Sequence, residues 1–210
     1  PSGEKISAKF FQNEKAEFTI LYSHGNAEDI FTSAPFFEKL SSAGFNVLAY
    51  DYRGYGTSEG TPSEKNSYED IETAYNYLAN EQKIAPEKII IHGRSLGGAI
   101  AIDLASQKKC GGLIVESSFV SAFRVMTGVS IYPFDKFESI NKISDVKCPT
   151  LFIHGTNDTL VPFWHGQKLF ETANEPKTFF AIENAGHNDL FEVAGKEYFE
   201  QIKRFLATLK

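Results

Sequence analysis

The feature that most constrains the fold of this chain is a series of short, continuous apolar segments separated by amphipathic ones. Six of these segments are predicted strands: 18–23, 46–50, 88–92, 112–116, 150–154 and 178–182. Because they do not alternate between apolar and polar residues, we expect a sheet covered on both faces. Between two of them, a predicted N-cap at Ser67 precedes an apolar stripe at helical spacing, formed by Ile71, Ala74, Tyr75 and Leu78. This alternation predicts an α/β fold with a mostly parallel central sheet.

Size and charge predict one acidic globular domain over residues 1–210. The chain is 42% hydrophobic and 23% charged, and its 21 Lys and Arg against 27 Asp and Glu give a net charge of −6. That balance disfavours a nucleic-acid groove or a polybasic membrane patch. No apolar run approaches the roughly 18 residues of a membrane span. The first residues, PSGEKISAKFF, lack the layout of a signal peptide.

The cysteine content indicates the compartment. Cys110 and Cys148 are the two cysteines of the chain, too few for a disulfide framework. Both precede predicted strands, which fits free buried thiols in a reducing environment. We therefore expect a cytoplasmic protein with no nucleic-acid partner and no integral membrane segment. The oligomeric state is not predicted.

The pattern G-x-S-x-G occurs twice, around Ser95 and around Ser58. A nucleophilic serine in this pattern needs a strand that runs directly into a helix, through a turn so tight that its flanking positions must be small. Gly93 follows the segment 88–92 at once, and a helical pattern begins at Leu96. Ser58 instead lies in a turn-rich loop. The context therefore predicts Ser95 as the nucleophile.

A serine hydroxyl becomes a good nucleophile when a neighbouring base removes its proton as it attacks. In this architecture an acid and then a histidine follow the serine, each in a loop after a later strand. Asp158 follows the segment 150–154, and His187 follows the segment 178–182. We predict His187 as general base and Asp158 as the residue that orients it. Glu116, at the end of another predicted strand, is the rival acid.

Two backbone N–H groups are needed to stabilise the oxyanion of the tetrahedral intermediate. The residue after the nucleophile, Leu96, is predicted to supply one of them. The loop after 18–23 begins His24-Gly25-Asn26, and its glycine allows close approach of the backbone to substrate. We expect the second N–H to come from Asn26, in preference to Ala27.

Five segments of the chain form a recognisable set: HGNAED (24–29), DYRGYGTSEGTPSE (51–64), GRSLGG (93–98), HGTND (154–158) and AGHND (185–189). Together they resemble the alpha/beta-hydrolase superfamily, and within it the depalmitoylases of the alpha/beta-hydrolase-domain-17 type and their bacterial relatives. The resemblance implies the alpha/beta-hydrolase fold and a small-molecule or acylated-protein ester or thioester as substrate. Arg94 departs from the Gln expected before the serine in that type. We also expect no counterpart of the cysteine-rich N-terminal segment that anchors the animal proteins to lipid.

The segment 117–147 is longer than a simple connection between strands and is rich in aromatic residues. It either packs on the domain or forms a small lid with an apolar acyl slot. On the second interpretation, the predicted substrate-binding residues are Phe119, Phe123, Met126 and Tyr132.

The favoured function is a serine hydrolase that cleaves carboxylic esters or thioesters through an acyl-enzyme intermediate, without a metal or other cofactor. The alternatives are a catalytically silent hydrolase fold used as a binding module, and a peptidase of the same superfamily. All the predicted chemical positions are present, which disfavours the binding module. A peptidase would need more recognition structure than 117–147 offers.

Overall fold

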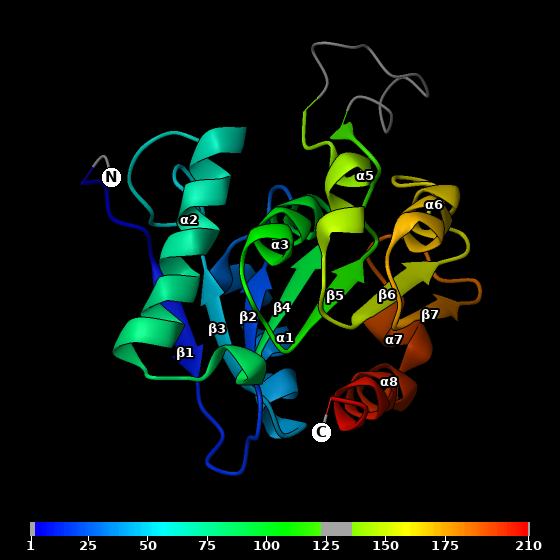
Figure 1. Cartoon of the computed structure of the whole chain (residues 1–210), viewed down its shortest axis with the longest axis horizontal. Coiled ribbons are helices and arrows are strands. Elements are labelled where there is room, and N and C mark those ends of the chain that lie inside the picture. Colours follow the sequence, from blue (N-terminus) through cyan, green and yellow to red (C-terminus); the bar gives the residue numbers. More distant parts are fainter. Residues whose placement is uncertain (1–2, 123–135, 210) are drawn as a thin grey trace.

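The computed structural model describes residues 3–122 and 136–209, in which one sheet has the strand order β1-β3-β2-β4-β5-β6-β7 (Figure 1). All neighbouring strands are parallel except β1, which pairs antiparallel with β3. The strands are β1 (Ala8–Phe11), β2 (Thr19–Ser23), β3 (Asn46–Tyr50), β4 (Ile89–Arg94), β5 (Gly112–Glu116), β6 (Thr150–Gly155) and β7 (Lys177–Ile182). Because β2, β4, β6 and β7 run in the same direction, the loops that follow them lie at the same end of the sheet, where the strands end.

Helices connect the strands and cover both faces of the sheet. The α-helices described are α1 (Ile30–Ser42), α2 (Glu64–Asn76), α3 (Leu96–Gln107), α5 (Ser139–Lys142), α6 (Trp164–Thr172), α7 (Leu190–Ala194) and α8 (Lys196–Ala207). Shorter helical turns are η1 (Tyr77–Glu81), η2 (Pro86–Lys88) and η3 (Ile143–Asp145). Among these described residues, no helix has the length and apolar character needed to cross a bilayer.

Alternation of side chains along the strands divides the core into two layers, one on each face of the sheet. Leu21, Leu48 and Ile91 pack with residues of α2, α3 and α6 on one face. Ile20, Val47 and Ile90 pack with residues of α1 and α8 on the other. Each inner strand therefore buries both of its faces, as its continuous apolar sequence predicts.

The six predicted strands are present, with three differences. The sequence analysis missed β1, a short edge strand with two exposed residues. The prediction that every strand is covered on both faces was wrong for β7. Its residues Thr178 and Ala181 are exposed, because β7 is the other edge strand of the sheet. The N-cap predicted at Ser67 was also wrong: α2 begins four residues earlier, where the Ser63 hydroxyl accepts from the Asn66 N–H. Ser67 lies inside the helix, and its hydroxyl donates to the Ser63 carbonyl at 2.9 Å.

Candidate active site

Ser95 lies between β4 and α3, at a turn with unusual backbone geometry. Its φ angle of 54° falls in the left-handed region, which is costly for a residue with a side chain. The turn fits because its flanks are glycines. A Cβ atom on Gly93 would lie 2.1 Å from the Gly97 carbonyl oxygen, and one on Gly97 would lie 2.0 Å from the Ser23 carbonyl oxygen. The N–H of Ser95 donates to the Glu116 carbonyl at 2.8 Å, which fixes the turn against the end of β5.

The imidazole of His187 lies between the Ser95 hydroxyl and the Asp158 carboxylate. Its Nε2 is 3.1 Å from Ser95 Oγ, and its Nδ1 is 2.7 Å from Asp158 Oδ2. These distances correspond to two hydrogen bonds in series. The loops of Asp158 and His187 are themselves joined, since the Asn157 N–H donates to the Ala185 carbonyl at 2.9 Å. The structure thus brings together three residues that are far apart in the sequence.

The carboxylate of Asp158 is buried and fully engaged. Its Oδ1 accepts from the backbone N–H groups of Leu160 and Val161, at 3.0 and 2.7 Å. Burial alone would raise the pKa of this carboxyl, but contacts with His154 and His187 and the Val161 N–H together hold the pKa well below its usual value. Asp158 is therefore ionised at neutral pH and can stabilise a positive charge on His187.

The rival acid, Glu116, has different partners. Its Oε2 accepts from the Tyr198 hydroxyl at 2.5 Å and lies 3.0 Å from Nε2 of His92. Burial raises the pKa of Glu116. The hydrogen bond from His92 and the nearby charge of Arg94 lower the pKa by more than burial raises it, so the net shift is downward. The carboxylate that contacts the His187 ring is that of Asp158. Geometry thus favours Asp158 as its acid.

The two predicted oxyanion donors, Leu96 and Asn26, lie at the start of α3 and in the turn after β2. Leu96 is the first residue of α3, and the N–H groups of a helix's first turn have no partner within the helix. Asn26 lies in the exposed turn after β2, where its side-chain Oδ1 accepts from the Tyr55 hydroxyl at 2.6 Å. Tyr55 is a residue that the sequence analysis missed, because nothing in its local pattern distinguishes it from other loop tyrosines.

The second G-x-S-x-G serine, Ser58, has a structural environment. Its hydroxyl donates to the Asp51 carbonyl at 2.7 Å and accepts from the Ser7 N–H at 2.8 Å. These bonds tie the start of β1 to the loop after β3. No catalytic partner of Ser58 is found among its described contacts. Ser58 therefore offers a control for experiments on Ser95.

The predicted substrate-binding residues are only partly described. Phe119 is 6% exposed and packs with Ala99 and Val161, which leaves little of its ring for a ligand. Phe123, Met126 and Tyr132 lie outside the described residues, as does the part of the predicted lid from 123 to 135. A cleft of about 540 Å³ is lined by His187 together with residues of α1 and α7. Its lining combines aromatic, charged and amide side chains, including Phe36, Phe191, Arg94, Asn26 and Asn188.

In the described parts of the chain, no cluster of three or more His, Cys, Asp or Glu side chains is placed to hold a metal ion. His24 directly follows β2, His92 and His154 lie in the C-terminal halves of β4 and β6, and all three have partners within the fold. For example, Nε2 of His154 donates to the Val161 carbonyl at 2.9 Å. These histidines support the loops of the candidate site rather than a shared ligand position.

Comparison with known proteins identifies the family. Residues 14–137 match the family model described as "Serine aminopeptidase, S33". The alpha/beta hydrolase domain-containing protein 17B of Homo sapiens is 40% identical over 209 residues, which cover 98% of this chain and 72% of that protein. The chain belongs to the alpha/beta-hydrolase family. This result confirms the resemblance stated from the five sequence motifs.

Solved structures show the same alpha/beta-hydrolase fold. A monoacylglycerol lipase of Paleococcus ferrophilus superposes with a TM-score of 0.78 at 21% identity, covering 98% of this chain and 100% of that one. An esterase of Pyrococcus furiosus gives a TM-score of 0.79 at 23% identity, covering 98% and 88% of the two chains. The predicted fold class is confirmed, and membership in the alpha/beta-hydrolase family supports hydrolase activity.

Proposed function

We propose that this chain is a serine acyl hydrolase that cleaves carboxylic esters or thioesters. The observation that carries the proposal is the series of hydrogen bonds from Ser95 Oγ through the His187 ring to Asp158, at 3.1 and 2.7 Å. In this proposal Ser95 is the nucleophile, His187 the general base and then acid, and Asp158 the residue that orients the ring.

The reaction begins when Ser95 Oγ attacks the acyl carbonyl carbon and passes its proton to Nε2 of His187. The imidazolium that forms is stabilised by the ionised Asp158 carboxylate at Nδ1. As the tetrahedral intermediate collapses, the bond from carbon to the leaving oxygen or sulfur breaks, and Nε2 returns the proton to the leaving group. Water then repeats the sequence on the acyl-enzyme, which releases the carboxylic acid and restores Ser95.

The negative charge on the intermediate is met by backbone donors. The proposed pair is the N–H of Leu96 and the N–H of Asn26. The site also lies at the N-terminus of α3, where the helix dipole favours a developing anion. Removing a single oxyanion-hole donor costs on the order of 10²- to 10³-fold in kcat in enzymes of this kind.

We infer an ester or thioester substrate of a small molecule or an acylated protein. The proposal is supported by the similarity to the alpha/beta hydrolase domain-containing protein 17B of Homo sapiens and by esterase and lipase structures of the same fold. Cys110 and Cys148 are free thiols, which fits action in the cytoplasm.

The test is labelling by a fluorophosphonate probe together with hydrolysis of p-nitrophenyl butyrate. The unmodified protein should show both, and Ser95→Ala should show neither. Ser58→Ala is the matched control, because it changes the serine of the other G-x-S-x-G match and should keep both activities. Labelling or turnover by Ser95→Ala at the unmodified level would overturn the proposal.

The same assay separates the alternatives. Because the matching family model is described as a serine aminopeptidase, an amino-acyl p-nitroanilide is included beside esters of two to sixteen carbons and a palmitoyl thioester. Faster cleavage of the anilide than of every ester and thioester would favour a peptidase. Failure of the intact protein to react with the probe or any of these substrates would favour a binding module.

A further inference from the structure

Arg94 directly precedes Ser95, and its guanidinium contacts three separate segments around the candidate site. Its side chain is 13% exposed. The partners are Glu28 in the loop that carries Asn26, His187 and Asn188 in the histidine loop, and Glu116 at the end of β5. One side chain therefore joins the serine turn to both of the loops with which it must act.

The contact with Glu28 reaches the oxyanion loop. The Arg94 Nη1 group bonds to Oε1 of Glu28, and the second oxygen of that carboxylate accepts from the Gly25 N–H at 3.0 Å. Gly25 immediately precedes Asn26. Since an ionised carboxylate binds both groups at once, Arg94 and Glu28 together fix where the loop backbone lies relative to Ser95.

The second contact reaches the histidine loop. The Arg94 Nη2 group donates to the His187 carbonyl at 2.9 Å and to Oδ1 of Asn188 at 2.7 Å. Asp158 orients the imidazole ring of His187 at Nδ1, whereas Arg94 holds the backbone of the same residue. The position of Nε2 in front of Ser95 Oγ depends on both.

The third contact anchors the guanidinium itself. Nε of Arg94 lies 3.5 Å from Oε1 of Glu116, a buried carboxylate that Tyr198 and His92 also hold. A guanidinium has five N–H donors in a fixed plane, so it can serve three directions at once. The ammonium group of a lysine carries its three N–H donors on one atom, and the neutral side-chain amide of a glutamine has two N–H donors.

From these contacts we infer that Arg94 is a positioning residue, which sets the oxyanion loop and His187 at their working distances from Ser95. The inference rests on the proposed function. Displacement of reacting groups by about 1 Å can cost on the order of 100-fold in rate. We expect Arg94→Gln to lower kcat for p-nitrophenyl butyrate roughly 10- to 100-fold while KM changes less than threefold.

The conservative variant tests the geometry. Arg94→Lys keeps the charge but not the planar set of donors, so it should recover only part of the lost kcat. If charge alone mattered, Arg94→Lys would match the unmodified protein, and this outcome would overturn the inference. Labelling by the fluorophosphonate should slow in parallel with kcat, because the probe also needs an oriented serine and oxyanion loop.

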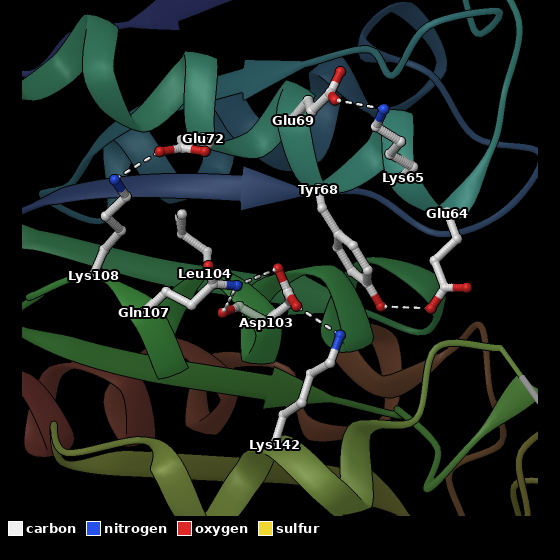
Figure 2. Close-up of a pocket in the computed structure, with 10 residues that line it drawn as sticks. All are labelled: Glu64, Lys65, Tyr68, Glu69, Glu72, Asp103, Leu104, Gln107, Lys108 and Lys142. Carbon is white, nitrogen blue, oxygen red and sulfur yellow. Dashed lines mark hydrogen bonds and ion pairs between the residues drawn. The ribbon is translucent and has the colours of Figure 1, made fainter.

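A matched control separates positioning from stability. Figure 2 shows Asp103 on α3 between Lys142 and Gln107, in a pocket that lies between α2 and α3. Asp103 bonds to Lys142 at 2.6 Å and to Gln107 at 2.9 Å, and its side chain is 10% exposed. Asp103→Asn therefore breaks an ion pair that is about as buried as the one between Arg94 and Glu28. Asp103 lies eight residues along the chain from Ser95, away from the candidate site. It should lower Tm with kcat unchanged.

A double variant identifies the partner. Glu28→Gln should also lower kcat, and Arg94→Gln with Glu28→Gln together should lose less than the product of the two single losses, because both remove one contact. Fully multiplicative losses, or a kcat of Arg94→Gln equal to that of Asp103→Asn, would overturn the inference. If Ser95→Ala is inactive in the same assay, the proposed function stands even where this inference fails.

Discussion

Nδ1 of His187 lies 2.7 Å from Oδ2 of Asp158, while the carboxylate of Glu116 bonds to Tyr198 and His92 instead. This difference predicts unequal effects when each acid is replaced by its amide. Asp158→Asn should reduce kcat by about 10³- to 10⁴-fold. The amide oxygen would keep the bonds from the Leu160 and Val161 N–H groups, so the NH2 group would face Nδ1 of His187, donate to it and select the wrong tautomer of the ring. Steady-state hydrolysis of p-nitrophenyl butyrate measures the loss.

Glu116→Gln is the comparison for that prediction. It should cost much less in kcat, since its effect reaches the site only through Arg94 and the Ser95 turn. A greater loss from Glu116→Gln than from Asp158→Asn would reverse the assignment of the acid.

The low pKa of Asp158 predicts how stability depends on pH. A carboxyl whose pKa is lower in the folded state than in the unfolded state stabilises the fold above the unfolded value, which is about 3.9 for Asp. This contribution is lost as pH falls from there toward the folded pKa. The difference in free energy of unfolding between the unmodified protein and Asp158→Asn should therefore be constant near neutrality and shrink in acid. Urea unfolding at several pH values provides the measurement, and a difference that grows in acid would contradict the prediction.

The close approach of Gly97 to β2 predicts intolerance of any side chain there. In Gly97→Ala the new Cβ would meet the Ser23 carbonyl oxygen at 2.0 Å, a backbone atom that cannot move aside. Either the α3 N-terminus shifts or the protein fails to fold, and both outcomes remove fluorophosphonate labelling.

Gly112→Ala is the control for that change, because its Cβ would meet a Phe205 ring carbon at 3.0 Å, and a side chain can adjust. It should lower Tm while labelling persists. Normal labelling of Gly97→Ala would show that the turn is less constrained than these distances indicate.

Cys110 and Cys148 should differ in reactivity. Their sulfur atoms lie 3.2 Å apart, with Cys110 as donor. The hydrogen bond to Cys148 and burial raise the pKa of Cys110, whereas accepting that bond lowers the pKa of Cys148. Cys148 is also the more exposed of the two. Iodoacetamide should therefore modify Cys148 first as pH rises, as peptide mass spectrometry can measure, and Cys148→Ser should lower the total uptake. Earlier modification of Cys110 would contradict the assigned donor.

Much of the fold could be predicted because the inner strands are buried on both faces and so carry a continuous apolar signal. The edge strands show where that signal fails. Ala8–Phe11 is short and half exposed, so β1 has no pattern of its own, and it forms because its backbone pairs with β3. Similarly, Ser67 with Asp70 three residues later has the local pattern of a helix start, but in the structure Asp70 binds Arg53 of the loop after β3 and Ser63 caps the helix.

The candidate site shows the same limit. Ser95, Asp158 and His187 each follow a strand within a recognisable local motif, so their positions could be predicted from the sequence. The roles of Arg94, Glu28 and Tyr55 depend on contacts between loops that are far apart along the chain. Phe119 was predicted to bind substrate from its aromatic character, which does not distinguish a ring that lines a slot from one packed beneath it.

Helix α3 is buried along its length from Gly97 to Ala105, with the sheet on one side and α2 and α5 on the other. A shift of α3 along or about its axis would break its packing contacts on both sides. On the proposed function, the serine at the start of this helix is held in place, and substrates of different shape are accommodated by the loops that follow β2 and β7. Selectivity can then change through those loops while the reacting hydroxyl stays where it is.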